Sequence, residues 1–215
     1  MANLKEIRSR IKSVKSIQKV TKAMKMVAAA KLRKSQENME QARPYAERLN
    51  GLIDDLMDNA NISTINLLSN KEKIQTIGFV IVTSDRGLAG SFNTNIIKKA
   101  EKEIKQYKKE DVKLFCIGKK GYEYFSKQGY TIEKYYIDFW NNLKFNVAID
   151  IGKDIVQSFI NNKVDEVKVI YNYFKNVATQ ETKYEQFLPI NPDEAEQNNK
   201  KTSTDILYEP SEKEL

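Results

Sequence analysis

The first 34 residues of this 215-residue chain combine a helical apolar pattern with a strong positive charge. Eleven Lys or Arg residues and one acid, Glu6, fall in this stretch, which contains neither Gly nor Pro. The segment therefore carries +10, whereas the whole chain carries +7. Because the charge is concentrated on one element, we expect that element to bind a partner.

Apolar residues in this segment recur at intervals of three and four, which is typical of one face of an α-helix. The series runs Leu4, Ile7, Ile11, Val14, Ile17, Val20, Met24, Val27, Ala28 and Leu32. The spacing continues more weakly past Pro44, a residue type that kinks or splits helices. We therefore predict a shaft over residues 1–57, either one helix kinked near Pro44 or two nearly collinear helices. About 55 helical residues would span roughly 80 Å.

The residue pattern after this helix predicts a linker at 58–73, a compact α/β domain at 74–190 and a polar segment at 191–215. Strands and helices alternate in this domain, which favours a mainly parallel sheet covered on both faces. The predicted strands are 77–83, 112–117, 130–136, 166–174 and 182–190, and the predicted helices are 93–107, 121–128 and 146–161. The long helix would overhang such a domain, so its apolar stripe requires a second helix or a surrounding protein.

Composition argues against several classes of function. The chain has no His and a single Cys, so we expect no zinc site, no cysteine-protease chemistry and no disulfide within the chain. Cys116 lies in an apolar strand, where we expect a buried core thiol. Apolar runs reach about six residues, far short of the roughly 20 that cross a bilayer, so we expect no membrane-spanning helix.

Two glycine-containing turns follow predicted strands. The first, at 84–93, contains Asp85, Arg86, Gly87, Gly90 and Asn93. Its backbone amides could hold an anion at a helix N-terminus, but its glycine spacing matches neither a P-loop nor a dinucleotide fingerprint. A structural turn, with Ser91 or Asn93 capping the next helix, is therefore favoured. The second, at 118–121, is interpreted as a turn with two solvated lysines.

Two long segments resemble the gamma subunit of F-type ATP synthases. Residues 22–34, KAMKMVAAAKLRK, resemble the start of that subunit, and residues 83–93, TSDRGLAGSFN, resemble the motif after its first strand. Shorter matches at 174–176, 188–189 and 207–210 follow in the same order. The resemblance thus covers essentially the whole chain.

This resemblance implies a non-catalytic rotor subunit that couples proton-driven rotation of a membrane c ring to ATP synthesis or hydrolysis on beta subunits. In this family two antiparallel helices form a coiled-coil shaft inside a ring of alternating alpha and beta subunits, and a Rossmann-like α/β domain braces its base. The implied partners are the alpha, beta and epsilon subunits and the c ring. Membrane association would be indirect, on the cytoplasmic face of a bacterial membrane, and no cofactor or nucleic acid is implied.

The resemblance also implies roles for particular residues. Those expected to face acidic loops of the beta subunits are Lys19, Lys22, Met24 and Lys25, with Lys31 and Arg33 as further candidates. Those expected to pack in the shaft are Ile7, Ile11, Val14 and Leu32. Their partner would be the family's C-terminal shaft helix, which this sequence does not reach before Leu215. Tyr208 and Glu209 would contact the c ring. The alternative for the lysines is the solvated face of a coiled coil.

A nucleic-acid-binding protein with a basic helix is the main functional alternative, because a cationic helix can follow phosphates. Against it, a basic-zipper protein places leucine heptads after its basic region, whereas here basic and apolar residues share the same turns. A small enzyme acting on an anionic ligand at the 85–93 turn is a third interpretation. The absence of His and of a phosphate fingerprint weakens it.

Overall fold

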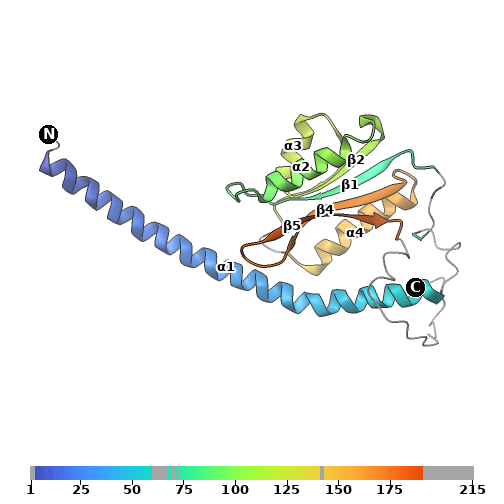
Figure 1. Ribbon diagram of the computed structural model, residues 1–215, viewed down its shortest axis with the longest axis horizontal. Helices are drawn as coiled ribbons and strands as arrows, with labels where there is room; N and C mark the ends of the chain where they lie inside the picture. The colour runs from blue at the N-terminus through green and yellow to red at the C-terminus, as the bar shows by residue number, and fades with distance from the viewer. Residues whose placement is uncertain (1–2, 60–66, 69–70, 72, 141–142, 191–215) are drawn as a thin grey trace. The chain divides into compact units, whose positions relative to one another are not determined.

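The computed structural model describes residues 3–59, 67–68, 71, 73–140 and 143–190, with the backbone alone for 54–59. The chain divides into two compact units, Met1–Asp58 and Asn59–Leu215. The first unit is a long helix and the second is an α/β domain (Figure 1).

Helix α1 runs from Leu4 to Asn59, a length of 56 residues, so the first unit is one helix and not two. It continues through Pro44, which lacks an amide hydrogen and is commonly accommodated in a helix by bending. Figure 1 shows α1 as one gently curved helix. At about 1.5 Å per residue it is roughly 80 Å long.

The α/β domain is built on a five-stranded sheet with the order β3-β2-β1-β4-β5. Strands β3, β2, β1 and β4 are parallel, and β5 runs antiparallel to β4. The strands are β1 Ile77–Val82, β2 Val112–Ile117, β3 Thr131–Tyr136, β4 Glu166–Phe174 and β5 Gln180–Leu188. This mainly parallel sheet confirms the fold class predicted from the sequence.

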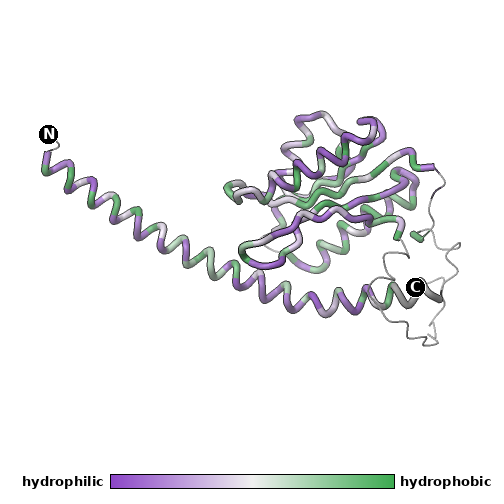
Figure 2. Tube along the Cα trace, in the orientation of Figure 1, coloured by the Kyte–Doolittle hydropathy of each residue, from purple (hydrophilic) through white to green (hydrophobic). Residues whose placement is uncertain are grey.

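Helices cover both faces of the sheet, as predicted. The helices are α2 Phe92–Ile104, α3 Lys119–Lys127, α4 Phe145–Ile160 and the short 3-10 helix η2 Lys109–Asp111. Alternate residues of β1 divide the core, because Phe79 and Ile81 pack with α2 and α3 whereas Val80 packs with α4. Figure 2 shows the apolar residues concentrated on the central strands. The helix predicted at 93–107 is shorter in the structure, because α2 ends at Ile104.

Helix α3 begins earlier than the sequence predicts, so the predicted turn at 118–121 is wrong. Gly118 is the N-cap residue of α3, and Lys119 and Lys120 lie in its first turn. Gly118 has φ 101°, and a Cβ atom there would lie 2.0 Å from the carbonyl oxygen of Thr83. Glycine is required because no side chain fits where the end of β1 touches the start of α3.

The chain enters and leaves the α/β domain at the end of the sheet where the parallel strands begin, the amino end. The amide of Ile190, after β5, donates a 2.9 Å hydrogen bond to the carbonyl oxygen of Leu67, before β1. Leu68 is buried beside this connection. Figure 1 shows the start of β1 and the end of β5 at the same end of the sheet.

Asp165 fastens the incoming chain to the start of β4. Its carboxylate accepts hydrogen bonds from the Nζ of Lys71 at 2.7 Å and from the amides of Gln75 and Thr76 at 2.8 Å each. Burial alone would raise the pKa of Asp165, but these donors and the Lys71 charge outweigh burial and hold the pKa below its ordinary value. The residues that precede β1 are therefore fixed to the domain.

Candidate interaction surfaces and the motif turn

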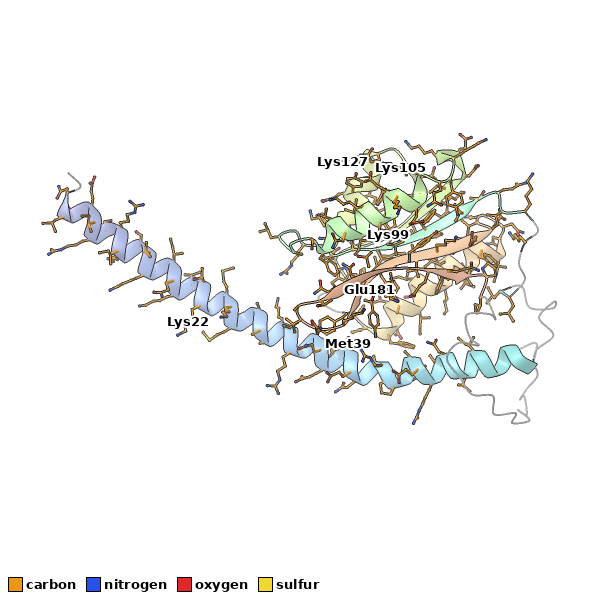
Figure 3. All side chains as sticks on the ribbon, in the orientation of Figure 1. Lys22, Met39, Lys99, Lys105, Lys127 and Glu181 are labelled. Atoms are coloured by element: carbon orange, nitrogen blue, oxygen red, sulfur yellow. The ribbon has the colours of Figure 1, made fainter. Side chains whose placement is uncertain are left out.

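The cationic part of α1 is accessible along its length. Lys19, Lys22, Met24 and Lys25 all have exposed side chains, and Figure 3 shows Lys22 projecting from the helix. The described residues contain no ion pair that involves these three lysines. The three cations are therefore available to an external acidic partner.

Helical geometry separates the lysines from Met24. At about 100° per residue, Lys19, Lys22 and Lys25 fall within roughly 120° on one side of α1. Met24 lies roughly 100–160° away from each of them by the same geometry, among the apolar residues Ile17 to Val27. The helix thus brings the three lysines together and places Met24, 64% exposed, on the apolar side.

The four residues predicted to pack in the shaft are all solvent-exposed in this structure. Ile7, Ile11, Val14 and Leu32 are between 40% and 58% exposed. A continuous apolar strip of this kind is unfavourable in water and is typical of a surface that another element covers. Their packing role stays a prediction.

Asp85 joins three loops where strands β1, β2 and β3 end, which we call the carboxyl end of the sheet. Its Oδ1 accepts a 2.8 Å hydrogen bond from the amide of Lys119, at the start of α3. Its Oδ2 accepts a 2.8 Å bond from the amide of Asp138, after β3. The α3 N-terminus, where an anionic ligand could bind, is therefore occupied by the chain's own carboxylate.

Asn93 shapes the motif turn at 84–93. Its Oδ1 accepts a 3.0 Å hydrogen bond from the amide of Ser84, and its Nδ2 donates to the carbonyl oxygen of Arg86 at 3.3 Å. Ser91 is the N-cap residue of α2 but makes no side-chain capping bond. Ser91 thus occupies the predicted N-cap position without a side-chain capping bond, whereas Asn93 folds the preceding turn instead.

The tip of the motif turn points into solvent. Leu88 is fully exposed and has φ 58°, and Gly90 has φ 57°. A groove of about 380 Å³ lies beside this tip, and α2 and α3 contribute Ile97, Lys120 and Tyr124 to its lining. Within the described ranges, no three acidic or Cys side chains are placed to hold a metal ion. The turn therefore presents an apolar side chain to solvent beside this groove.

Two further predictions concern contact with a c ring and the presence of a membrane-spanning helix. Tyr208 and Glu209, predicted to contact the c ring, lie outside the described residues. Among the helices that are described, none is both long and apolar enough to cross a membrane.

Comparison with known proteins gives consistent matches. The family model described as ATP synthase matches residues 3–215. The ATP synthase gamma chain of Chlorobium phaeobacteroides (strain BS1) is 43% identical, over 98% of this chain and 73% of that protein. The ATP synthase gamma chain of Cytophaga hutchinsonii is 42% identical, over 100% of this chain and 75% of that protein.

Solved structures agree in fold. The central stalk of the Tetrahymena thermophila mitochondrial ATP synthase has a TM-score of 0.65 and 26% identity, over 79% of this chain and 72% of that chain. The rotor of the Euglena gracilis mitochondrial ATP synthase has a TM-score of 0.58 and 19% identity, over 94% of this chain and 70% of that chain. These similarities agree with the rotor interpretation and give no support to the nucleic-acid alternative.

Proposed function

This chain belongs to the ATP synthase gamma-chain family, and we infer from this that it is a rotor subunit of the central stalk. It has no catalytic residues of its own, and it transmits rotation of the c ring to catalytic sites on the beta subunits. The observation that carries this conclusion is the match to gamma chains along nearly the whole sequence. The long helix and mainly parallel sheet agree with it.

We propose that the cationic side of α1 meets acidic loops of the beta subunits. The support is the set of three exposed lysines, Lys19, Lys22 and Lys25, on one side of the helix. An exposed ion pair contributes about 0.2–1 kcal/mol, so three pairs together would contribute about 0.6–3 kcal/mol. Coupling would therefore rest on several contacts and on the shape of the shaft. Met24, on the apolar side of α1, would add an apolar contact whose flexible side chain can adapt to its partner.

The remaining partners follow from the same assignment. Ile7, Ile11, Val14 and Leu32 would pack against the family's second shaft helix, since their side chains are exposed here. The epsilon subunit and the c ring would bind the stalk, and Tyr208 and Glu209 would contact the c ring. The chain would thus be held peripherally at the cytoplasmic face of the membrane through the c ring.

A matched pair of charge variants tests the proposed beta contact. In the test variant, Lys19, Lys22 and Lys25 are all changed to Gln; in the control, the exposed α2 and post-α2 residues Lys98, Lys102 and Lys105 are changed to Gln. Both variants lose three positive charges. Binding to isolated alpha and beta subunits is measured at low and high salt.

We expect the α1 variant to bind more weakly, by about 3- to 150-fold at low salt, and to lose much of the salt dependence. The control should bind like the unmodified chain. Equal loss in both variants would show a net-charge effect and remove the proposed contact. If the unmodified chain does not bind at all, the rotor assignment itself is in doubt.

A further inference from the structure

Helix α1 carries two groups of apolar residues that share one heptad repeat. Their members are Leu4, Ile7, Ile11 and Val14 in the first group, and Met39, Ala42, Ala46, Leu49 and Ile53 in the second. The spacing within each group alternates between three and four residues, and the groups start 35 residues apart, which is five heptads. Both groups therefore lie on the same side of a helix that follows the coiled-coil repeat. Both present exposed side chains, with Leu4 73% and Leu49 39% exposed.

The residues between the two groups break this repeat. Gln18, Thr21 and Lys25 occupy positions where the heptad repeat would place apolar residues, whereas the apolar residues from Ile17 to Val27 lie to one side. A partner helix that follows the repeat therefore finds its apolar contacts mainly at the two ends of α1.

The charges of α1 are also divided between its two ends. Residues 4–25 contain eight Lys or Arg and one acid, Glu6, which gives +7. Residues 35–56 contain two Arg and five acids, which gives −3. Each end of α1 therefore attracts the opposite end of a second copy and repels the same end.

Charged side chains also form rows on one flank of the apolar groups. Arg8, Lys15 and Lys22 are seven residues apart, as are Glu40 and Glu47, and each directly follows a position of the heptad repeat. All five therefore lie about 100° from the apolar side, on the same flank of α1. They are exposed and make no ion pair within the described part of the chain. The rows are available to a second helix.

We propose that two copies of this chain pair through α1 in antiparallel orientation. A two-fold axis near residue 30 places the basic segment 4–25 of each helix along the acidic segment 35–56 of the other. The first apolar group of each copy then packs on the second group of its partner, and the flanking rows of opposite charge meet. Parallel pairing would place two +7 segments side by side. The proposal goes beyond the rotor assignment and does not depend on it.

The two-fold axis determines which residues meet. A residue faces the partner residue whose number is about 60 minus its own, and each contact occurs twice by symmetry. The apolar contacts are Ile7 with Ile53, Ile11 with Leu49, and Val14 with Ala46. Near the axis, the short side chains of residues 28–30, all Ala, allow the two helices to approach closely.

This pairing and shaft assembly exclude each other. Ile7, Ile11 and Val14 are also the residues that the proposed function assigns to the second shaft helix, and one helix at a time can cover them. The pair is therefore a form of the chain outside the ATP synthase, in which an apolar strip that is unfavourable in water is covered. The pair has to dissociate before a second shaft helix packs on α1.

Sedimentation equilibrium of the purified 215-residue chain tests the pairing. We expect a monomer–dimer equilibrium. In the test variant, Ile11 and Leu49 are both changed to Glu; in the control, Ser9 and Ser16, exposed on the opposite side of α1, are changed to Glu. Both variants add two negative charges. The dimer dissociation constant should rise at least about 100-fold in the test variant and stay within about threefold in the control. Circular dichroism checks that both variants keep their helix.

Disulfide trapping tests the orientation. The variants Val14→Cys and Ala46→Cys are mixed and oxidised by air with a copper catalyst, and Cys116 is buried and does not compete. We expect a disulfide between the two variants, and none between two copies of Val14→Cys.

The outcomes separate this proposal from the rotor assignment. A chain that stays monomeric, or test and control variants that dimerise equally, would overturn the pairing. Linkage of Val14→Cys to itself, without linkage to Ala46→Cys, would overturn the antiparallel orientation. Binding to alpha and beta subunits is measured separately, so a monomeric chain that binds them would overturn the pairing alone. A dimeric chain that binds neither would leave the pairing standing and count against the rotor assignment.

Discussion

The carboxylate of Asp85 and the backbone amide of Asp138 are joined by a 2.8 Å hydrogen bond that spans the end of the intervening strand β2. The other oxygen of the same carboxylate holds the amide of Lys119, at the start of the helix that follows β2. One side chain therefore fixes the exits of three strands. The motif residue is used to shape the domain, and this role needs no bound ligand.

Replacing Asp85 should loosen this end of the domain. Asp85→Ala leaves the amides of Lys119 and Asp138 without their charged acceptor, so we expect the free energy of unfolding to fall by about 2–4 kcal/mol. Urea unfolding measures the loss, and hydrogen exchange at the Lys119 amide should become faster. Arg86→Ala, next to it in the exposed turn, should stay within about 0.5 kcal/mol. Equal stability of the Asp85 variant would show that the bonds contribute little.

Two glycine variants should change stability in opposite directions. Gly118→Ala places a Cβ atom 2.0 Å from the Thr83 carbonyl oxygen, so we expect a loss of about 3 kcal/mol or more. Gly152→Ala, inside α4, meets no atom within 4 Å, and it should gain up to about 1 kcal/mol from helix propensity. Thermal unfolding of both variants checks this, and similar melting temperatures would contradict the close approach at Gly118.

Stability should depend on pH through Asp165. Because its pKa in the folded protein lies below the ordinary value, its stabilising effect is full above the unfolded pKa of about 4 and is lost as the pH falls through the folded pKa. Asp165→Asn should lower the free energy of unfolding by about 1–3 kcal/mol at pH 7. The difference from the unmodified protein should shrink below pH ~4.

Denaturant unfolding at pH 7 and pH ~3 measures this difference. Glu110→Gln is the control, because Glu110 is exposed on η2. A gap between the Asp165 variant and the unmodified protein that stays constant with pH would contradict a charge-dependent role for this carboxylate.

The thiol of Cys116 should be unreactive in the folded protein. The side chain is fully buried, and burial raises its pKa to about 12, so almost no thiolate is present at pH ~8. We expect an aromatic disulfide reagent to modify Cys116 at a rate set by unfolding, and rapidly in denaturant. Fast modification without denaturant would show that strand β2 opens readily.

Features set by local sequence patterns could be predicted well. The β-branched and aromatic run at 77–83 predicted β1, and the spacing of Val147, Ile151 and Ile155 predicted α4. The apolar strand around Cys116 predicted that its thiol is buried. In each case the signal lies within a few consecutive residues and reflects burial on one face. The parallel order also followed, because alternating strands and helices admit few arrangements.

Features set by distant backbone groups could not be predicted. Asp85 binds amides 34 and 53 residues further along the chain, and a backbone amide leaves no mark in the sequence. The same holds for Gly118, the N-cap residue of α3, where the Thr83 carbonyl oxygen leaves no room for a side chain. The expected cap by Asn93 failed for a related reason, since its side chain found partners in the preceding turn.

The hydrogen bond between Ile190 and Leu67 makes the α/β domain resemble an insertion. The two ends of the segment between these residues meet, so the segment could in principle be removed and its flanks rejoined by a short linker. A domain attached in this way can lengthen, shrink or change its surface without altering the register of the helix that precedes it. The shaft and the domain of this rotor subunit are therefore free to diverge separately.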